Sequence, residues 1–450
     1  MDDACESAAS RAAESAFCDG RRGAGRRLLR VIALPLFVAA VALPGCGGGA
    51  DATRANLRLV NASLAYPALD LVVDDKAVQS GVGYGERADY EGVDAEQVDV
   101  RISRAGSPAA LASLEARLAE GKRYAIVAHG GEAALRATLL DEETREPERG
   151  EARLRVLHGA ADAGALDIYL TGPEVELADA EPLFAAAAAD STSAFTTVDA
   201  AGWRLRVTAA GDRDDLRLDL PAVALTSRQV ATLIVTPGGG GVLVGALLLT
   251  QGGAVERLDG THARVRAVAG VSASGTVAAS VGSVALVDGV GSPAIGPYRL
   301  VPAGAAAATL SVDGAAVDVP PATLRPGDDY TLLVRGTPLA PAASWIADDN
   351  RPPTQAGRAR LRLVNGLADL DAALSMTLDF TPLAAGVLPG AASTPVTVDA
   401  SGAARIAVTA AGLGEPLYVV DEQALQAGSV YSVFVLGATD AVVGVPYRDR

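Results

Sequence analysis

The sequence predicts an all-β chain, in which tandem immunoglobulin-like antiparallel β-sandwich domains follow an N-terminal signal segment. Two observations predict this class. A strand-like motif recurs four times, beginning at residues 57, 154, 265 and 361. Between its copies lie short runs of alternating apolar and polar residues, separated by Gly, Pro and Asp, and no sustained helical period interrupts them. Each unit is therefore about 90–100 residues long, the size of an immunoglobulin-like sandwich.

The first motif opens each unit and alternates as a strand with one buried face does. It reads LRLVN at 57–61, LRVLH at 154–158, VRAVA at 265–269 and again LRLVN at 361–365. The first and last copies are identical, so we interpret the units as repeats of one another.

A second motif, L-x-x-G-x-x-Y, comes late in the repeats and precedes a strongly apolar run. It occupies 118–124, 324–330 and 425–431. In the second repeat, Arg228 and Ala231 replace the Gly and the Tyr. Gly permits the bend, and an inward Tyr anchors the strand that follows. We therefore expect a packing motif and not a binding site.

The repeats and the polar connections between them divide the chain into six parts. These are a lipoprotein signal peptide (1–45), a lipidated tether (46–55) and β-sandwich repeats 1 to 4 (56–147, 152–256, 262–349 and 358–450). Only the alanine run at 185–189 favours a turn of helix.

The amino-terminal segment has the order of a secretory signal. A basic run at 21–30 precedes an apolar run at 31–43, which is shorter than the roughly 20 residues of a membrane-spanning helix. Residues 43–46 read LPGC and resemble the lipobox of bacterial lipoproteins. That resemblance implies cleavage before Cys46 and attachment of a lipid to its thiol. An uncleaved anchor with an incidental Cys is the alternative.

The residue after Cys46 is Gly47, where Asp would resemble the signal that retains lipoproteins in the inner membrane of Gram-negative bacteria. We therefore expect an exported protein that is lipid-anchored to the cell envelope, in the outer rather than the inner membrane. The other two cysteines, Cys5 and Cys18, lie in the segment expected to be removed. The mature protein would then have no disulfide.

The formal net charge of −16 bears on partners. An acidic surface repels phosphate backbones, so nucleic acid is not an expected partner. The membrane is one partner, through the N-terminal lipid; a protein or glycan partner is possible, and the sequence does not identify it.

Three features together resemble one known family. They are the stretch ARLRVLHGAADAGALDIYL at 152–170, the VPAG turn at 301–304, and the L-x-x-G-x-x-Y motif before a hydrophobic strand. This combination resembles the bacterial domain-of-unknown-function family 4397, found in exported and lipid-anchored proteins. Asp167 and Tyr169 match the family's D-V-Y strand, and we place Asp70 and Asp371 at the same position in repeats 1 and 4. The resemblance implies about four tandem copies and no established biochemical role.

Candidate sites for chemistry are few. His129, His158 and His262 have no His or Cys at metal-ligand spacing, so we expect no metal site, no cofactor and no catalytic residue. The glycines at 238–241 predict a hairpin loop. Acids at 74–75, 212–215 and 348–349 are interpreted as solvated turns, with calcium ligation as the alternative. We interpret Asp70, Asp167 and Asp371 as hydrogen-bond acceptors at strand ends, with a shared ligand site as the alternative.

These observations favour a non-catalytic structural or interaction role, such as adhesion or binding, for a lipid-anchored envelope protein. A small-ligand or calcium-binding envelope module is the alternative. An envelope enzyme is the third hypothesis, for which repeat 2, with its longer segment around 172–195, is the candidate. Cys46 is the one site residue that the sequence identifies, and the ligand-binding residues are unknown.

Overall fold

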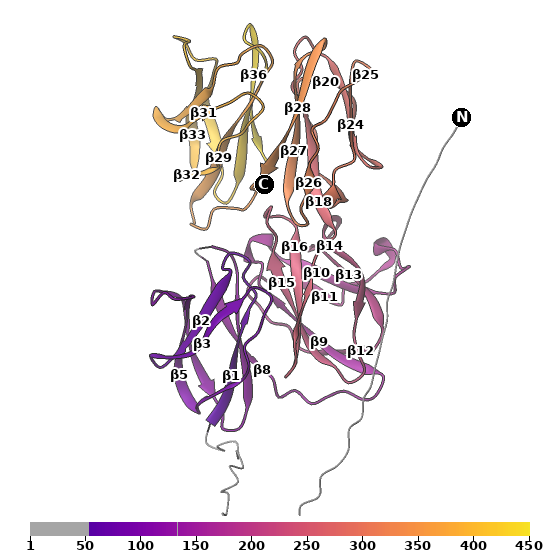
Figure 1. Cartoon of the computed structure of the whole chain (residues 1–450), viewed down its shortest axis with the longest axis vertical. Coiled ribbons are helices and arrows are strands. Elements are labelled where there is room, and N and C mark those ends of the chain that lie inside the picture. The colour runs from indigo at the N-terminus through magenta and orange to yellow at the C-terminus, as the bar shows by residue number, and fades with distance from the viewer. Residues whose placement is uncertain (1–53, 133) are drawn as a thin grey trace, which may run out of the picture. The chain divides into compact units, whose positions relative to one another are not determined.

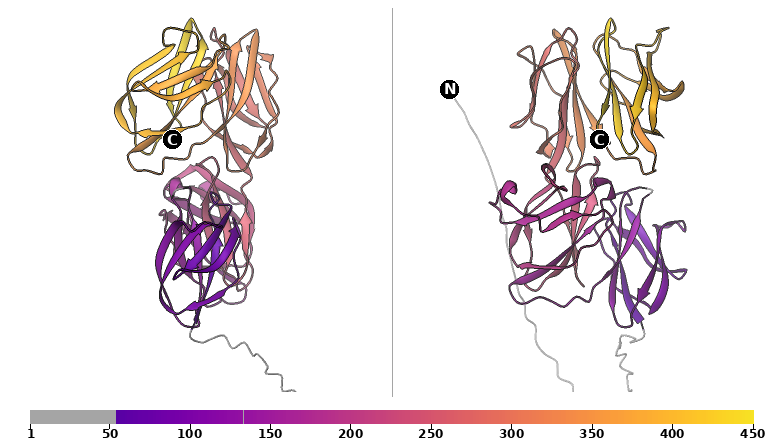
Figure 2. Two further views of the ribbon diagram at one scale, coloured as in Figure 1. Left: turned by 60° about the vertical axis from the view of Figure 1, so that its left-hand side comes forward. Right: turned by 180° about the vertical axis from the view of Figure 1, so that it is seen from behind.

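A computed structural model describes residues 54–132 and 134–450 of the chain. The fold class is confirmed: the described residues form 36 β-strands and two short 3₁₀ helices, with no α-helix among them. The eight large sheets occur in sequential pairs, and each pair encloses an apolar core of its own. We number the resulting sandwiches 1 to 4 in chain order; Figure 1 shows each as two layers of strands, and Figure 2 shows the layers from two further sides.

Sandwich 1 consists of two four-stranded sheets, β4-β1-β7-β8 and β3-β2-β5-β6. Its strands are β1 (Arg54–Asn61), β2 (Ala68–Val73), β3 (Lys76–Gly83), β4 (Glu91–Asp94), β5 (Glu96–Arg104), β6 (Ala110–Leu118), β7 (Arg123–His129) and β8 (Arg136–Asp141). The alternating pattern of β1 and β5 has its predicted effect, because every second side chain enters the core.

Sandwich 2 has the same plan, with sheets β12-β9-β15-β16-β17 and β11-β10-β13-β14. Its elements are β9 (Glu151–His158), η1 (Ala161–Ala163), β10 (Leu166–Thr171), η2 (Leu177–Asp179), β11 (Phe184–Ala187), β12 (Thr196–Asp199), β13 (Gly202–Ala209), β14 (Asp212–Ala224), β15 (Val230–Pro237), β16 (Val244–Thr250) and β17 (Val255–Leu258). Two expectations were wrong here. The alanine run begins as β11, because it pairs with β10, and the connection after 251 contains β17, which pairs with β16.

Sandwich 3 has sheets β21-β18-β27-β28, with β22 also paired to β18, and β20-β19-β24-β25; β23 and β26 form a small pair. Its strands are β18 (His262–Ala269), β19 (Thr276–Val281), β20 (Val284–Gly291), β21 (Ala294–Ile295), β22 (Arg299–Pro302), β23 (Gly304–Ala305), β24 (Ala308–Val312), β25 (Ala315–Ala316), β26 (Thr323–Leu324), β27 (Asp329–Thr337) and β28 (Ala340–Asp348).

Sandwich 4 has sheets β32-β29-β35-β36 and β31-β30-β33-β34. Its strands are β29 (Arg358–Leu367), β30 (Leu374–Leu378), β31 (Thr381–Val387), β32 (Val396–Asp399), β33 (Ser401–Ala410), β34 (Tyr418–Leu425), β35 (Val430–Ala438) and β36 (Ala441–Arg448).

One pairing in every sandwich differs from the predicted antiparallel arrangement. The strand of the first motif and the strand after the second motif pair in parallel, with Leu57 opposite Tyr124 and Leu361 opposite Tyr431. The two strands run in the same direction in all four sandwiches, with five strands between them in sandwiches 1, 2 and 4 and eight in sandwich 3. All other pairings of the described strands are antiparallel.

The second motif is a packing motif, as expected. The Tyr hydroxyl accepts a hydrogen bond from the backbone N–H five residues earlier: Tyr124 from Ala119 at 3.2 Å and Tyr431 from Gln426 at 3.0 Å. The Gly of the motif takes a positive φ, as does Arg228, which stands in its place in sandwich 2 with φ 67°. Arg228 therefore adopts a conformation that suits Gly better than a side-chain-bearing residue.

The first sheets of neighbouring sandwiches are buried on both faces. Val60 and Val127 of sandwich 1 share an apolar cluster with Leu157 and Ile234 of sandwich 2. Residues of sandwiches 3 and 4 form a second such cluster, including Leu333 and Phe434. Sandwiches 1 and 2 therefore pack together through their first sheets, and so do sandwiches 3 and 4.

Candidate functional site

Cys46 and the predicted signal peptide lie outside the described residues. Within those residues, no helix is long and apolar enough to cross a membrane. The remaining predicted site residues can be placed, and the histidines come first.

His129 ends β7 and His158 ends β9, and both imidazoles are fully buried. His129 Nε2 lies 2.9 Å from Thr138 Oγ1, and His158 Nε2 lies 2.7 Å from the Gly164 carbonyl oxygen. Burial lowers the pKa of both rings. His262 begins β18. The part of the chain that the structure describes contains no group of three His, Cys, Asp or Glu residues able to hold a metal ion.

One group of side chains is arranged in space like a nucleophile, a base and an acid of a catalytic triad: Thr138, His129 and Asp190. However, His129 Nδ1 lies 3.8 Å from Asp190 Oδ1, beyond hydrogen-bond distance, and no part of the His129 side chain is exposed to a substrate. We assign this group to packing between sandwiches 1 and 2.

The equivalent acids Asp70 and Asp167 are hydrogen-bond acceptors, as interpreted from the sequence. Asp70 accepts from the backbone N–H groups of Gly81 and Gly106 at 2.7 and 2.9 Å, and Asp167 is bonded in the same way by neighbouring strands. The placement of Asp371 was wrong. The register of β30 with β33 puts Ser375 at this position. Asp70 and Asp167 each lie 13 residues after the start of the first motif, whereas Asp371 lies only 10 residues after it.

The interpretation of the acids at 348–349 as a solvated turn was also wrong. Asp348 and Asn350 are buried, and Asp349 receives bidentate hydrogen bonds from Arg351 and Arg360. Arginines therefore already neutralise the two acids of this cluster. The acids at 74–75, in contrast, do form an exposed two-residue turn between β2 and β3.

The chemistry that the sequence did not reveal lies at the second position of the first motif. Arg58, Arg155, Arg266 and Arg362 occupy this position in the four sandwiches. Each points away from its own core, yet Arg58, Arg266 and Arg362 are no more than 2% exposed. We call these four residues the interface arginines, because the neighbouring sandwich covers them.

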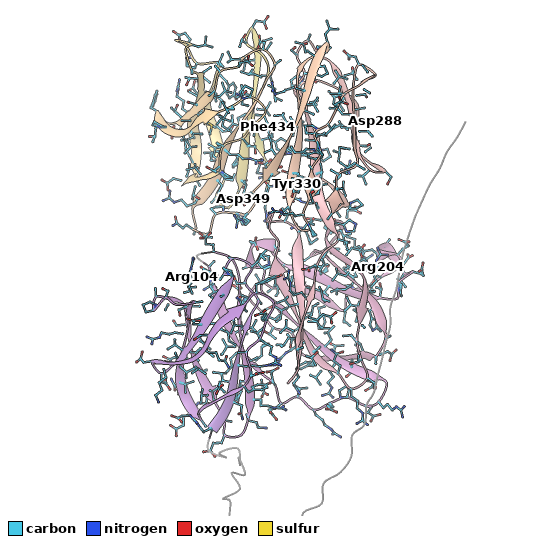
Figure 3. All side chains as sticks on the ribbon, viewed as in Figure 1. Arg104, Arg204, Asp288, Tyr330, Asp349 and Phe434 are labelled. Atoms are coloured by element: carbon cyan, nitrogen blue, oxygen red, sulfur yellow. The ribbon has the colours of Figure 1, made fainter. Side chains whose placement is uncertain are left out.

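Between sandwiches 3 and 4, each interface arginine pairs with an acid of the other sandwich. Arg362 of sandwich 4 lies 2.7 Å from Asp348 of sandwich 3, and Arg266 of sandwich 3 lies 2.5 Å from Asp449 of sandwich 4. Tyr298 lies 4.5 Å from the Arg266 guanidinium and donates its hydroxyl proton to Asp348 at 2.7 Å. Figure 3 labels Phe434, whose ring also lies 5.1 Å from the Arg266 guanidinium, and Asp349.

The ionisable groups of this network shift one another's pKa values. Burial alone would raise the pKa of Asp348, but the guanidiniums of Arg362 and Arg266 outweigh burial and hold the pKa below its ordinary value. Burial and the neighbouring carboxylates raise the pKa of the Tyr298 hydroxyl, which stays a proton donor. The carboxylate of Asp348 is therefore ionised, between two guanidinium groups.

Sandwiches 1 and 2 use the same positions in a different way. Arg58 pairs with Glu142 of its own sandwich and donates to the Gly253 carbonyl oxygen of sandwich 2 at 2.7 Å. Tyr90 takes the place of Tyr298, with its ring 4.8 Å from the Arg58 guanidinium and its hydroxyl 2.6 Å from Glu142. In sandwich 2 the corresponding acid is replaced by Gln251, which exchanges hydrogen bonds with the Thr144 backbone.

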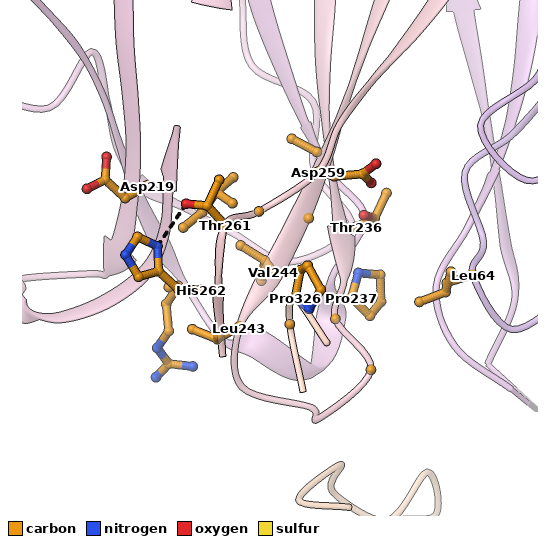
Figure 4. Close-up of a pocket in the computed structure, with 18 of the residues that line it drawn as sticks. Leu64, Asp219, Thr236, Pro237, Leu243, Val244, Asp259, Thr261, His262 and Pro326 are labelled. Carbon is orange, nitrogen blue, oxygen red and sulfur yellow. Dashed lines mark hydrogen bonds between the residues drawn. The ribbon is translucent and has the colours of Figure 1, made fainter. Parts of the chain in front are cut away.

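Figure 4 shows a pocket of about 300 Å³ that is lined in part by titratable residues. Apolar side chains of β14, β16 and their connections line it, together with Leu64 and Leu300. Its polar residues are already engaged: His262 lies 3.0 Å from Thr261 Oγ1, and Asp219 binds Arg204 at 2.6 and 2.8 Å. Such a pocket can hold a small, largely apolar molecule.

The glycines at 238–241 form the predicted hairpin loop between β15 and β16, and Gly238 and Gly239 line this pocket. They also meet sandwich 3, since Gly240 donates its N–H to the Gly327 carbonyl oxygen at 2.9 Å. A Cβ on Gly240 would lie 2.5 Å from the Asp329 nitrogen. Close backbone approach therefore requires glycine there.

Residues 55–169 match the family model described as "Domain of unknown function (DUF4397)". The match spans sandwich 1 and continues through β9 into β10 of sandwich 2. It supports the family resemblance for this part of the chain. No curated protein matches the chain.

Proposed function

We propose that this chain is a lipid-anchored cell-envelope protein in which four tandem copies of the DUF4397-like sandwich serve a structural or interaction role without catalysis. The observation that carries the proposal is the repeated use of buried charge to join sandwiches. The interface arginines and their acids lie between domains rather than around a cleft, as expected of residues that hold a scaffold together.

The anchoring part of the proposal rests on the lipobox-like sequence at Cys46. Metabolic labelling with palmitate tests it in a bacterial host that processes lipoproteins. We expect label on the wild-type chain and none on a Cys46→Ala variant, which should move to the soluble fraction. Cys18→Ala is the matched control and should keep its label. Label that persists on Cys46→Ala would contradict anchoring at this residue.

The interaction role is tested on intact cells that make the full chain, by protease treatment and then by crosslinking. Release of sandwich fragments would place them outside the cell, where adhesion partners would be sought. Protection would place them in the periplasm. Crosslinking that recovers no partner in either compartment would leave only the structural role.

A second candidate, a small-ligand module, is favoured by the apolar pocket beside His262. Native mass spectrometry of the protein purified from its host would reveal a retained molecule. Val244→Trp should fill the pocket and remove that molecule, and thermal shifts with and without calcium would test the calcium alternative. An unliganded protein whose melting temperature calcium does not change would reject this candidate.

A further inference from the structure

Sandwich 2 carries a segment that its neighbours lack. Residues 172–183, which we call the strap, connect β10 to β11 and include η2. The corresponding connections are two-residue turns in the other sandwiches: 74–75, 282–283 and 379–380. The strap is therefore an insertion relative to the shared plan.

The strap covers arginines on the outer face of the sheet β11-β10-β13-β14. Leu205 and Val207 of β13 enter the core. Side chains alternate along a strand, so Arg204 and Arg206 face outward. Arg206 is nevertheless only 2% exposed. Its equivalent in sandwich 1, Arg101, has a side chain that is 45% exposed. The strap accounts for this difference.

The contacts between arginines and strap are made to the main chain. Arg206 donates to the Val175 carbonyl oxygen at 2.8 Å. Arg213, on β14, donates to the carbonyl oxygens of Ala178 and Ala180, both at 2.8 Å. Guanidiniums that bind successive carbonyl groups recognise an extended polypeptide without regard to most of its side chains.

An acid of the strap approaches an arginine of the sheet. The strap carries four acids within 172–183, and the strands beneath carry Arg204, Arg206 and Arg213 beside the acids Asp167, Asp212, Asp214, Asp215 and Asp219. Glu181 of the strap lies 3.5 Å from Arg213. Figure 3 labels Arg204 on this face.

The strap covers this face but leaves one hydrogen-bond donor of an arginine without a partner. Nε of Arg206 is buried and has no hydrogen-bond partner. Within the strap only Ala180 is fully buried, so little apolar area holds it in place. A segment that is weakly held over an unsatisfied donor is suited to displacement.

We propose that the arginine face of sandwich 2 is a binding surface for an extended, acidic polypeptide segment, and that the strap is its built-in occupant. The partner displaces the strap and takes over its carbonyl and carboxylate contacts. This proposal does not depend on lipid attachment at Cys46.

The test replaces residues 172–183 of the full chain with the Gly282-Ser283 turn of sandwich 3. Fluorescence anisotropy then measures binding of a labelled peptide with the sequence of the strap, and of a second peptide with its acids changed to amides. We expect the strapless chain to bind the acidic peptide at least about tenfold more tightly than the intact chain does, which is about 1.4 kcal/mol. The amide peptide should bind about tenfold more weakly, and salt should reduce binding of the acidic one.

Arg206→Gln in the strapless chain should abolish binding, whereas Arg101→Gln, the equivalent change in sandwich 1, should leave it unchanged. A folded strapless chain that does not bind the peptide, or an intact chain that binds it equally well, would overturn the proposal. Equal binding of both peptides, or of heparin in place of peptide, would overturn the assignment to an acidic polypeptide.

A second measurement decides the matter if the strapless chain does not fold. Glutamyl endopeptidase cleaves after acids of the strap in the intact protein. Arg213→Gln should accelerate this cleavage several-fold, and Arg101→Gln should not. Unchanged cleavage would mean that the arginines do not hold the strap, and the proposal would fail.

Discussion

Asp348→Asn removes one charge from the network between sandwiches 3 and 4 and changes almost no volume. The carboxylate lies 2.7 Å from the Arg362 guanidinium and 4.0 Å from that of Arg266, and it is fully buried. At an effective dielectric constant of about 20, these attractions amount to about 6 and about 4 kcal/mol. An uncharged Asn no longer has to lose its charge hydration, which offsets several kcal/mol of this loss.

The net loss in the free energy of unfolding should be about 3–5 kcal/mol, as is typical when one partner of a buried ion pair is removed. Asp421→Asn is the matched control in sandwich 4. Asp421 lies 3.1 Å from Arg405, but its side chain is 70% exposed. The same substitution there should cost at most about 1 kcal/mol.

The chain's two tryptophans allow the pairs to be monitored separately. Trp345 lies on β28 of sandwich 3, and Trp203 lies on β13 of sandwich 2. Urea unfolding followed by fluorescence in a Trp203→Phe background therefore reports on sandwiches 3 and 4 alone. Asp348→Asn should lower the midpoint of that transition. With Trp345→Phe instead, the transition of sandwiches 1 and 2 should change far less.

Two results would refute this reasoning. A loss below about 1 kcal/mol would mean that the carboxylate contributes no more than an exposed partner does. Equal losses for Asp348→Asn and Asp421→Asn would mean that burial does not strengthen the interaction.

Three further predictions concern backbone, protons and the contact of sandwich 2 with sandwich 3. Arg228→Gly should raise the melting temperature, with a gain of about 1 kcal/mol at most, because glycine relieves the positive φ; a lower melting temperature would contradict this. Burial lowers the pKa of His129 and His158, so the unfolded chain takes up protons first as pH falls below about 6.5. Stability should therefore decrease from pH 7 toward 5, and changing both residues to Gln should flatten that dependence, as urea midpoints would show. Gly240→Ala should cost about 1–3 kcal/mol in thermal unfolding, because its Cβ meets backbone; Gly414→Ala, which meets nothing within 4 Å, should cost little.

The fold class followed from local pattern. Alternation in the first motif and the glycine bend of the second are properties of short segments, so the sequence displays them directly. The sequence did not reveal how the two motifs pair. They pair in parallel, with Leu57 opposite Tyr124, although more than 60 residues separate these two positions. Parallel pairing depends on the direction in which the chain returns to the sheet, and a one-dimensional pattern does not reveal that.

The interface arginines show where pattern reasoning was insufficient. A polar residue in an alternating strand is normally a solvent-facing residue, and Arg58 fits that pattern. Its burial depends on a second sandwich covering the sheet. One signal did exist, because the runs after the second motif, such as AIVA and TLLV, are apolar on both faces. A strand that is apolar on both faces indicates a sheet covered on both sides.

The misplacement of Asp371 and the misreading of Asp348 have a common origin. Both lie next to connections, where spacing in sequence says little about position in space. The register of β30 with β33 places the equivalent position at Ser375. Asp348 is the last residue of β28, and its side chain meets arginines of two sandwiches. Only three-dimensional register separates these cases from a solvated turn.

The pairing of first sheets has a consequence for how the chain is made. Sandwich 1 emerges from the ribosome before sandwich 2, with the apolar residues Val60 and Val127 and the charged Arg58 still uncovered. Sandwich 3 is likewise uncovered until sandwich 4 is complete, since its partner Asp449 follows β36, the final strand of sandwich 4. A chain with an odd number of sandwiches therefore exposes an apolar sheet face, which can associate with other chains. Truncation after residue 258 should leave a stable, soluble pair, whereas truncation after residue 348 should leave a fragment that aggregates.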